Sequence, residues 1–424
     1  METIGFVTIL VCILLAALIS RRVQNTIVTM PMVYTTMGLL IGPLFFNLVD
    51  IDPRSHGLQL VAELTLVIVL ANDAARIDIQ RLFRDHSLPQ RLLGIGLPLT
   101  MVLGALIAAL LFPEISFIEA VILAIVLTPT DASLGQSVVS NPKVPVRIRQ
   151  ALNIESGLND GIALPFLLLA IGIALDLEVA IGSGRFVIEV ITDMLIGGLV
   201  GVALGYIGCR AIRWGIKSKW MSSRFQKISA LALVLLAFSA AAILGGNGYI
   251  AAFLFGLTFG NTFGRRESEN LIDFSEMQVD LLMLVTFLLF GAVMLPHALE
   301  QLNLAIVGFS VLSLTVMRML PVWISMVRAK IHPVTTLFLG WFGPRGIASI
   351  LYVFTVLEAE YLPAEKVIYS AGMITVLLSV FAHGITAAPL SNRYGARMSE
   401  LKQVELAPVE NEDVSEMPLR TKGN

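Results

Sequence analysis

The stretch NIESGLNDG, residues 153–161, lies inside a longer segment that is otherwise composed mainly of Ala, Leu, Ile and Phe. The segment predicts a membrane-spanning helix, and inserting a carboxylate such as Asp160 into a bilayer costs at least about 2.5 kcal/mol. Ionisable residues in such segments are rare and mark functional sites. A second carboxylate, Asp131, ends the run Thr128-Pro129-Thr130-Asp131 in the preceding apolar segment. Two acids beside a helix breaker predict a binding site for a cation or a proton.

The composition indicates a polytopic membrane protein. Of the 424 residues, 56% are hydrophobic and 14% are charged, whereas soluble domains are about 25% charged. Apolar runs that are long enough to cross a bilayer recur along the chain. They predict an all-α protein with thirteen transmembrane helices, at 2–20, 28–47, 57–76, 89–112, 116–139, 148–173, 186–209, 226–244, 247–263, 274–295, 302–326, 334–357 and 367–390.

The basic residues predict the orientation of these helices. If the N-terminus is outside, almost every Lys and Arg, Arg318 included, falls on the cytoplasmic side, as the positive-inside rule requires. Only Arg54, Arg185 and Lys366 fall outside, and Arg345 lies within a helix. We therefore expect a multi-pass protein of the cell inner (plasma) membrane with a cytoplasmic C-terminus. Its polar, acidic tail, residues 391–424, is expected to be disordered.

Two of the predicted helices are interrupted near their middle. Pro129 breaks the helix at 116–139, and Gly343-Pro344-Arg345-Gly346 breaks the helix at 334–357, because proline cannot donate a backbone hydrogen bond. Each is the middle helix of a trio, and the trios are offset by an odd number of helices, so they have opposite orientations. Inverted repeats with matching broken helices are typical of the binding sites of secondary transporters.

The helix at 148–173 carries two adjacent polar stripes. Ser156 and Asp160 share one face, and Glu155 and Asn159 share the next, since residues four apart are neighbours on a helix. Hard oxygen ligands suit an alkali cation such as Na+, and the candidate ligands are Asp160, Asp131, Asn159, Ser156 and Thr130. The sequence has no His or Cys cluster for a transition metal, so we expect no cofactor. The expected partners are a monovalent cation, the proton and the lipid bilayer, and no nucleic acid.

Arg345 and Glu155 have a different interpretation. An arginine cannot deprotonate in a protein, so Arg345 must be paired within the membrane, and Glu155 is the best-placed acid. We expect this ion pair to hold the two broken trios together. Asp131 could also cap a half-helix, a role that is compatible with binding an ion. Asp73, near the cytoplasmic end of the third helix, is either a solvated interfacial acid or part of the ion pathway.

Thr130-Asp131, Glu155-Ser156-Gly157-Leu158-Asn159-Asp160 and Gly343-Pro344-Arg345-Gly346 together resemble the NhaP-type sodium/proton antiporters of the monovalent cation:proton antiporter superfamily. The resemblance implies a homodimer. Its core domain would comprise helices four to six and eleven to thirteen (86–175 and 300–390). Its dimerisation domain would comprise helices one to three and eight to ten (1–80 and 225–297), joined by linker helix seven (184–215).

The resemblance also assigns roles to individual residues. The residue matching Asp160 carries the ion and the proton, those matching Thr130, Asp131, Ser156 and Asn159 surround it, and those matching Glu155 and Arg345 form a stabilising ion pair. Relatives with Asn-Asp at positions 159–160 tend to exchange one cation for one proton, which implies electroneutral exchange. Many relatives have Phe-Glu near the end of helix three, whereas this sequence has Ala71-Asn72-Asp73-Ala74.

We therefore expect a transporter and not an enzyme. It would exchange Na+ or Li+ for H+ by alternating access, with Asp160 binding the cation and the proton in competition. A K+/H+ antiporter of the same superfamily is the main competing interpretation, because the sequence does not fix the size of the site. A cation channel, a sensory or scaffold protein and an organic-anion symporter are less favoured, and no selectivity-filter loop or output domain supports the first two.

Overall fold

The computed structural model describes residues 2–24, 26–85, 87–131, 134–178, 185–263, 278–359, 362–403, 409–412 and 414. Every regular element in these ranges is a helix, which confirms the predicted all-α class. The helices of the first half are α1 (Glu2–Gln24), α2 (Met30–Ile41), α3 (His56–Ala75), α4 (Ile79–Asp85), α5 (Ser87–Arg91), η1 (Leu92–Gly96), α6 (Leu97–Leu111), α7 (Phe117–Val126), α8 (Gln136–Val139) and α9 (Val146–Glu178).

The second half is built in the same way from long and short helices. They are α10 (Arg185–Lys217), α11 (Ser223–Ile243), α12 (Gly248–Phe263), η2 (Phe290–Met294), α14 (Leu295–Glu300), α15 (Leu304–Leu314), α16 (Val316–Met326), α17 (Pro333–Trp341), α18 (Ile347–Glu358) and α19 (Glu365–Gln403). In the described ranges, nine helical segments are long and apolar enough to cross a membrane. Four shorter apolar helices, α2, α7, α12 and α18, accompany them. The total of thirteen crossings stays a prediction.

Both predicted helix interruptions are present. The first break lies between the end of α7 at Val126 and the start of α8 at Gln136, and the second separates Trp341 of α17 from Ile347 of α18. The two non-helical segments touch each other, because the backbone N–H of Asp131 donates to the carbonyl of Pro344 at 2.8 Å. The broken helices therefore meet at their interruptions, as crossed half-helices would.

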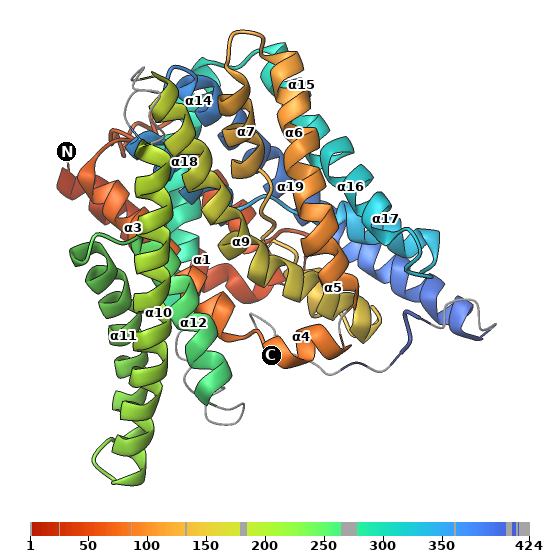
Figure 1. The fold of residues 1–424 in the computed structure, drawn as a ribbon. Coiled ribbons are helices and arrows are strands. Elements are labelled where there is room, and N and C mark those ends of the chain that lie inside the picture. Colours follow the sequence, from red (N-terminus) through yellow and green to blue (C-terminus); the bar gives the residue numbers. More distant parts are fainter. Residues whose placement is uncertain are drawn as a thin grey trace.

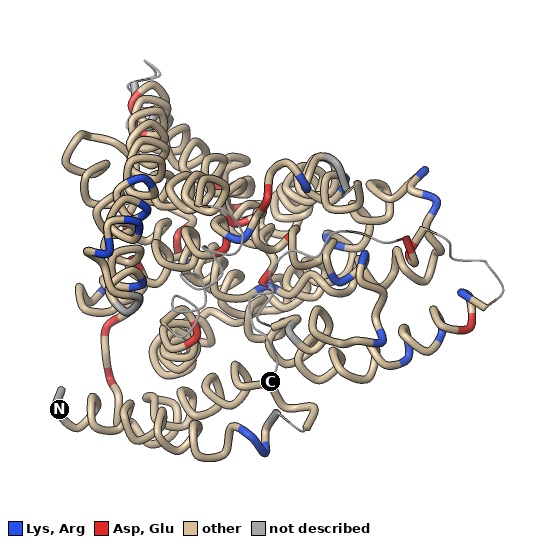
Figure 2. The backbone as a smooth tube through the Cα atoms, turned by 90° about the horizontal axis from the view of Figure 1, so that it is seen from below, with Lys and Arg blue, Asp and Glu red and all other residues tan. Residues whose placement is uncertain are grey.

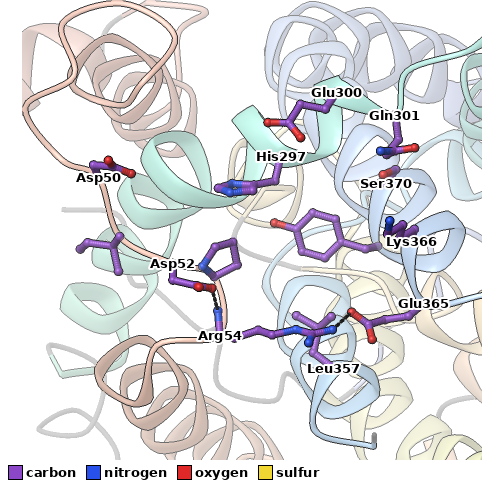
Figure 3. A pocket seen from close by; sticks show the side chains of 13 residues that line it. Asp50, Asp52, Arg54, His297, Glu300, Gln301, Leu357, Glu365, Lys366 and Ser370 are labelled. Carbon is purple, nitrogen blue, oxygen red and sulfur yellow. Dashed lines mark hydrogen bonds and ion pairs between the residues drawn. The ribbon is translucent and has the colours of Figure 1, made fainter. Parts of the chain in front are cut away.

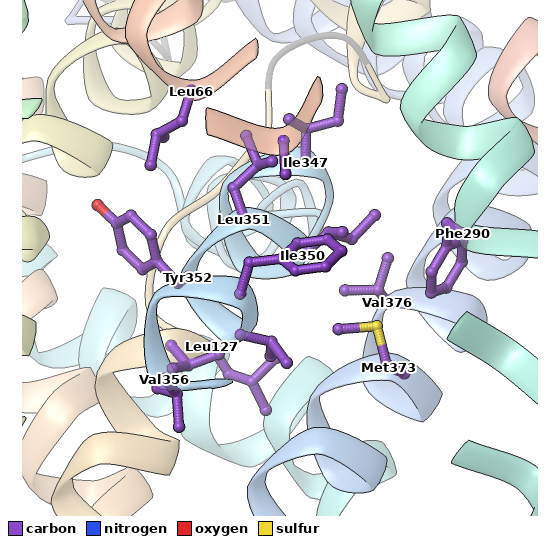
Figure 4. Packing of buried hydrophobic residues seen from close by; sticks show 14 of the residues in the cluster. Leu66, Leu127, Phe290, Ile347, Ile350, Leu351, Tyr352, Val356, Met373 and Val376 are labelled. Carbon is purple, nitrogen blue, oxygen red and sulfur yellow. The ribbon is translucent and has the colours of Figure 1, made fainter. Parts of the chain in front are cut away.

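The half-helix α18 lies at the centre of the molecule. Leu66 of α3, Leu127, Phe290 of η2 and Met373 of α19 surround it (Figure 4). Every residue of α18 from Ile347 to Leu357 is buried, and a helix that is apolar all round is typical of such an interior position.

Figure 1 shows how the remaining helices are arranged around this centre. Helices α3, α10, α11 and α12 lie together on one side, and α6, α16 and α17 lie on the other side, with α9 between them. The paired helices α10 and α11 extend further downward than the rest of the structure. Residues 50–54 and α14 lie at the opposite end.

The tail differs from its prediction. Residues 391–403, for which disorder is predicted, continue α19, which ends only at Gln403. Further along, the carboxylate of Glu410 is buried and accepts hydrogen bonds from the backbone N–H of His332 at 2.6 Å and the hydroxyl of Thr335 at 2.9 Å. Arg147 of α9 binds the carbonyl of Val409 and the carboxylate of Glu412. Helix polarity explains the contact, since a carboxylate at the N-terminus of α17 satisfies free N–H groups.

Candidate ion-binding site

The site is built where the two helix interruptions meet. Asp131, in the first break, accepts a hydrogen bond on Oδ2 from the backbone N–H of Ile347 at 3.0 Å. Ile347 is the first residue of α18, so Asp131 caps a half-helix of the other repeat. A carboxylate is favoured there because a helix N-terminus carries unsatisfied N–H groups and a partial positive charge.

Arg345, in the second break, makes the reciprocal contact. Its Nη1 donates to the carbonyls of Thr128 at 2.5 Å and Pro129 at 3.2 Å, just beyond the C-terminal end of α7. A guanidinium is favoured there because the last carbonyls of a helix lack partners and carry a partial negative charge. The side chain of Arg345 is fully buried, with a relative exposure of 0%.

The second break is held in place by α19. The backbone N–H of Arg345 donates to Oγ of Ser379 at 2.6 Å, and the ring of His383 bridges Ser379 and the carbonyl of Trp341. Gly346 is required for the crossing, because a Cβ there would collide with the carboxylate of Asp131. His383 therefore has a structural role, because its ring links α19 to the second break.

A small cavity of about 10 Å³ lies beside the crossing. Three of the predicted ligands, Thr130, Asp131 and Ser156, line it together with apolar side chains that include Val138 and Phe342. A cavity of about 10–15 Å³ is the smallest that holds one water molecule, so this space is of the size of a single small ligand. The structure thus brings these three residues together.

Asn159 and Asp160 are buried on the same helix, α9, but do not line this cavity. Asn159 is joined to the first break, because its Nδ2 donates to Oγ1 of Thr130 at 2.6 Å. Its Oδ1 is also buried, and accepts no hydrogen bond within the part of the chain that the structure describes. The backbone carbonyl of Asp160 accepts a hydrogen bond from the hydroxyl of Tyr352 on α18. Asp160 is therefore held close to both broken helices.

The prediction that Glu155 pairs with Arg345 is wrong, because Glu155 pairs with Arg318 instead. Both carboxylate oxygens of Glu155 accept hydrogen bonds from Arg318 of α16, at 2.5 and 2.8 Å. This bidentate geometry matches a guanidinium to a carboxylate, whereas Arg345 is engaged by the carbonyls of the first break. Arg318 was also expected on the cytoplasmic side, but its side chain is buried, with a relative exposure of 3%.

Asp73 lies near the site, although on a different helix. Its relative exposure is 5%, so it is not a solvated interfacial acid. A Cβ built on Gly157 of α9 would be 3.8 Å from the carbonyl oxygen of Asp73, which places this part of α3 against the segment of α9 that carries Ser156. A role for Asp73 in binding the ion stays a prediction.

Sequence reasoning missed two residues of the site. Arg318 is the only charged residue within the predicted helix 302–326, and this isolation is a signal that could have identified it. Tyr352 carries no such signal, since a neutral tyrosine in an apolar helix gives no indication of its role until its hydroxyl is seen to reach Asp160.

A second, much larger cavity of about 490 Å³ lies at the end of the molecule that is predicted to be outside (Figure 3). An ion pair between Arg54 and Glu365, 2.5 Å long, crosses it from the loop before α3 to the start of α19. The charged groups that line it are the carboxylates of Asp50, Asp52, Glu300 and Glu365, the side chains of Arg54 and Lys366, and the ring of His297. Carboxylates thus outnumber the permanent cations, which favours cations in this cavity.

Comparisons with known proteins agree with this architecture. A family model described as "Sodium/hydrogen exchanger, transmembrane" matches residues 6–393. The solved structure of the sodium proton antiporter MjNhaP1 from Methanocaldococcus jannaschii superimposes with a TM-score of 0.76, covering 93% of this chain and 99% of that one. At 19% identity, this likeness supports a common fold.

Two curated relatives illustrate the sequence similarity. A Na+/H+ antiporter of Saccharomyces cerevisiae is 28% identical over 342 residues, covering 74% of this chain and 33% of that protein. A K+/H+ antiporter named NhaP from Alkalimonas amylolytica is 25% identical over 419 residues, covering 92% of this chain and 67% of that protein. The chain therefore spans about a third of the length of the budding-yeast relative and about two thirds of the bacterial one.

Proposed function

Because the chain belongs to the sodium/hydrogen exchanger family, we propose that it exchanges Na+ or Li+ for H+ across a membrane by alternating access. The family consists of multi-pass membrane transporters, and the apolar helices of this chain fit such a protein. Asp160 is the proposed carrier, with Asp131, Ser156, Thr130 and Asn159 as oxygen ligands for the ion.

The observation that carries the proposal is the meeting of Thr130, Asp131 and Ser156 at one small cavity. These residues come from the first break and from α9, the helix that also carries Asp160. Oxygen ligands of this kind suit a small alkali cation. Irregular backbone at membrane depth lines a site or is buried within protein, and the residues of the two breaks at 127–131 and 342–346 are buried.

The charges around the crossing support electroneutral exchange. The buried carboxylates of Asp131, Glu155 and Asp160 exceed the buried guanidinium groups of Arg318 and Arg345 by one. One monovalent cation or one proton neutralises this difference. A neutral site crosses a low-dielectric barrier more easily than a charged one, so this difference of one charge supports exchange of one cation for one proton.

The finer assignments belong to the same proposal. The core domain, 86–175 and 300–390, would move against a dimerisation domain, 1–80 and 225–297, in a homodimer of the plasma membrane with its N-terminus outside. The acidic cavity at Asp50 and Glu300 would then lie on the outer route to the site. The position of Asp73 beside α9 supports a contribution to the inner part of the route.

The K+/H+ alternative is kept because the bacterial relative NhaP is named for that activity. A carboxylate site exchanges protons for either ion, and the selectivity depends on small differences in the size and rigidity of the site. The two activities differ only in which added cation drives proton movement.

Proton flux in proteoliposomes tests the proposal. The purified protein is reconstituted, the voltage is clamped, and Na+, Li+ and K+ are added in turn. Na+ and Li+ are expected to drive proton movement without net current, and Asp160→Asn is expected to abolish it in a protein that still folds. Glu400→Gln, which changes an exposed carboxylate of α19, is the matched control. Full exchange by Asp160→Asn would refute the assignment of Asp160 as the carrier. Proton movement driven by K+ alone would show that the transported cation is K+ and not Na+.

A further inference from the structure

The end of α10 and the start of α11 carry charge of one sign. Between Met194 and Phe263 the sequence contains no Asp or Glu, whereas it contains the basic residues Arg210, Arg213, Lys217, Lys219, Arg224 and Lys227. The positive-inside rule explains an excess of Lys and Arg on this side. It does not explain why exposed aromatic residues accompany them.

The length of α10 places these residues at the surface of the bilayer. The helix has 33 residues, or about 50 Å at a rise of about 1.5 Å per residue, whereas the hydrocarbon core is about 30 Å thick. Its exposed apolar side chains run from Ile188 to Ile207, which is itself about 30 Å of helix. Arg210 and the residues after it therefore lie at the level of the lipid headgroups.

Aromatic side chains lie among the basic groups. Tyr206, Arg210 and Trp214 are spaced by four residues and share a face of α10, and the guanidinium of Arg210 lies over the ring of Tyr206, 4.8 Å from its centre. Trp214 packs edge-on against Trp220 with ring centres 4.9 Å apart. Trp214 and Trp220 are nevertheless 57% and 79% exposed. Tryptophans so exposed are unfavourable in water but are enriched where a membrane meets water.

Helices α10 and α11 form a hairpin, and its basic residues divide into two groups. Arg213 has an internal role, because it donates to the carbonyl of Thr262 at 2.6 Å and so fastens α10 to the end of α12. Arg210, Lys217 and Lys219 are exposed, and none forms an ion pair with a carboxylate in the described part of the chain. Glu410 and Glu412, the acidic tail residues that the structure describes, bind Thr335 and Arg147 instead.

We propose that Arg210, Lys217 and Lys219, with Trp214 and Trp220, form a binding site for the phosphate headgroups of anionic phospholipids. Figure 2 shows Lys and Arg gathered along this pair of helices in the view from below. An arginine fork binds a phosphate through two donors, and lysines add point charges. The two tryptophans lie at the depth of the glycerol backbone and fix the hairpin in the interface. Basic clusters directly beside a transmembrane helix bind anionic lipid in this way.

The test compares lipid binding by two triple variants of the full chain. The first is Arg210→Gln, Lys217→Gln and Lys219→Gln. The matched control is Arg393→Gln, Arg397→Gln and Lys402→Gln, which removes three exposed basic residues of α19. Each protein is purified in detergent, its melting temperature is recorded, and bound phosphatidylglycerol is counted by native mass spectrometry. The hairpin variant is expected to lose at least tenfold in affinity for phosphatidylglycerol, and the α19 variant less than twofold. Equal losses in both variants would overturn the proposal.

Fluorescence locates the lipid independently of the charge substitutions. In a chain carrying Trp323→Phe and Trp341→Phe, only Trp214 and Trp220 emit, because the sequence has 4 tryptophans. Brominated phosphatidylglycerol in phosphatidylcholine nanodiscs is expected to quench this emission at lower mole fractions than brominated phosphatidylcholine does. Equal quenching by the two lipids, or displacement of phosphatidylglycerol by millimolar glycerol phosphate, would refute a headgroup site for membrane lipid. If the triple variant melts early, Lys217→Gln with Lys219→Gln replaces it and is again expected to lose more affinity for phosphatidylglycerol than the α19 variant.

Discussion

The two helix interruptions occupy corresponding places in the two repeats, yet they carry opposite charges and make different contacts. The first break carries Asp131, which caps α18 and also lines the small cavity. The second break carries Arg345, which binds the carbonyls beyond α7 and is sealed from that cavity. Asp131 can exchange a proton, whereas Arg345 cannot. One break therefore serves the proposed site, and the other holds it in shape.

Replacing Arg345 should break this arrangement most severely. Arg345→Met leaves the carbonyls of Thr128 and Pro129 without their buried donor. We expect a loss of about 3–5 kcal/mol, the range for removing one member of a buried charged arrangement. The melting temperature in detergent and the yield of folded protein measure the effect. Arg397→Gln, on the exposed part of α19, is the control, and equal stability of the two variants would show that the second break does not depend on its arginine.

A double-mutant cycle should identify the partner of Glu155. Glu155→Gln and Arg318→Gln are each expected to destabilise the protein by about 3 kcal/mol, because each leaves a buried charge without its partner. The double variant should recover about 1–3 kcal/mol of the summed loss, as contacting residues do. The same cycle with Arg345→Gln in place of Arg318→Gln should show a smaller coupling. The reverse ranking would restore the pair that the sequence predicted.

Asp131→Asn should separate the two roles of the first break. The amide oxygen can still accept the N–H of Ile347, so the expected loss of stability is only about 1 kcal/mol, as for a weakened N-cap. Cation-dependent proton flux should fall more than the stability does, because the cavity loses a charged ligand. Unchanged flux at several cation concentrations would restrict Asp131 to capping.

A similarly small loss of stability, without a direct effect on the ion site, is expected at the tail, which binds the start of the second broken helix. Glu410→Gln keeps the shape of the side chain but removes the charge at the N-terminus of α17, which should cost about 1 kcal/mol. Thermal unfolding of this variant is compared with Glu400→Gln, which lies exposed on α19. If both variants melt at the wild-type temperature, the tail contact does not stabilise the core.

The positions of the two breaks could be predicted from the sequence, whereas the partner of Glu155 could not. Pro129 in the first helix and Gly343, Pro344 and Gly346 in the second were sufficient to predict both interruptions, because proline and glycine act on the backbone locally. The partner of Glu155 was not predictable in the same way. Two buried arginines could satisfy it, and the choice depends on how α16 packs against α9, which is a long-range property of the fold.

The prediction of disorder was wrong for residues 391–403 and 409–412 of the tail, for a related reason. Composition describes how residues 391–424 behave alone, and their low hydrophobicity indicated disorder. It does not register that α17 begins with free N–H groups beside Arg147, so that an acidic residue such as Glu410 finds a complementary partner.

Because Asp131 and Arg345 each bind the end of a half-helix, their two charges cannot be exchanged with each other. An ordinary ion pair tolerates reversal, because each group sees only the other. Asp131 instead faces the N-terminal end of α18, and Arg345 faces the carbonyls just beyond the C-terminal end of α7. The polarity of each helix end is fixed by the direction of the chain. Placing arginine at 131 and aspartate at 345 would set like against like at both junctions. The direction in which each half-helix runs thus dictates which repeat contributes the acid, and the two repeats are not interchangeable.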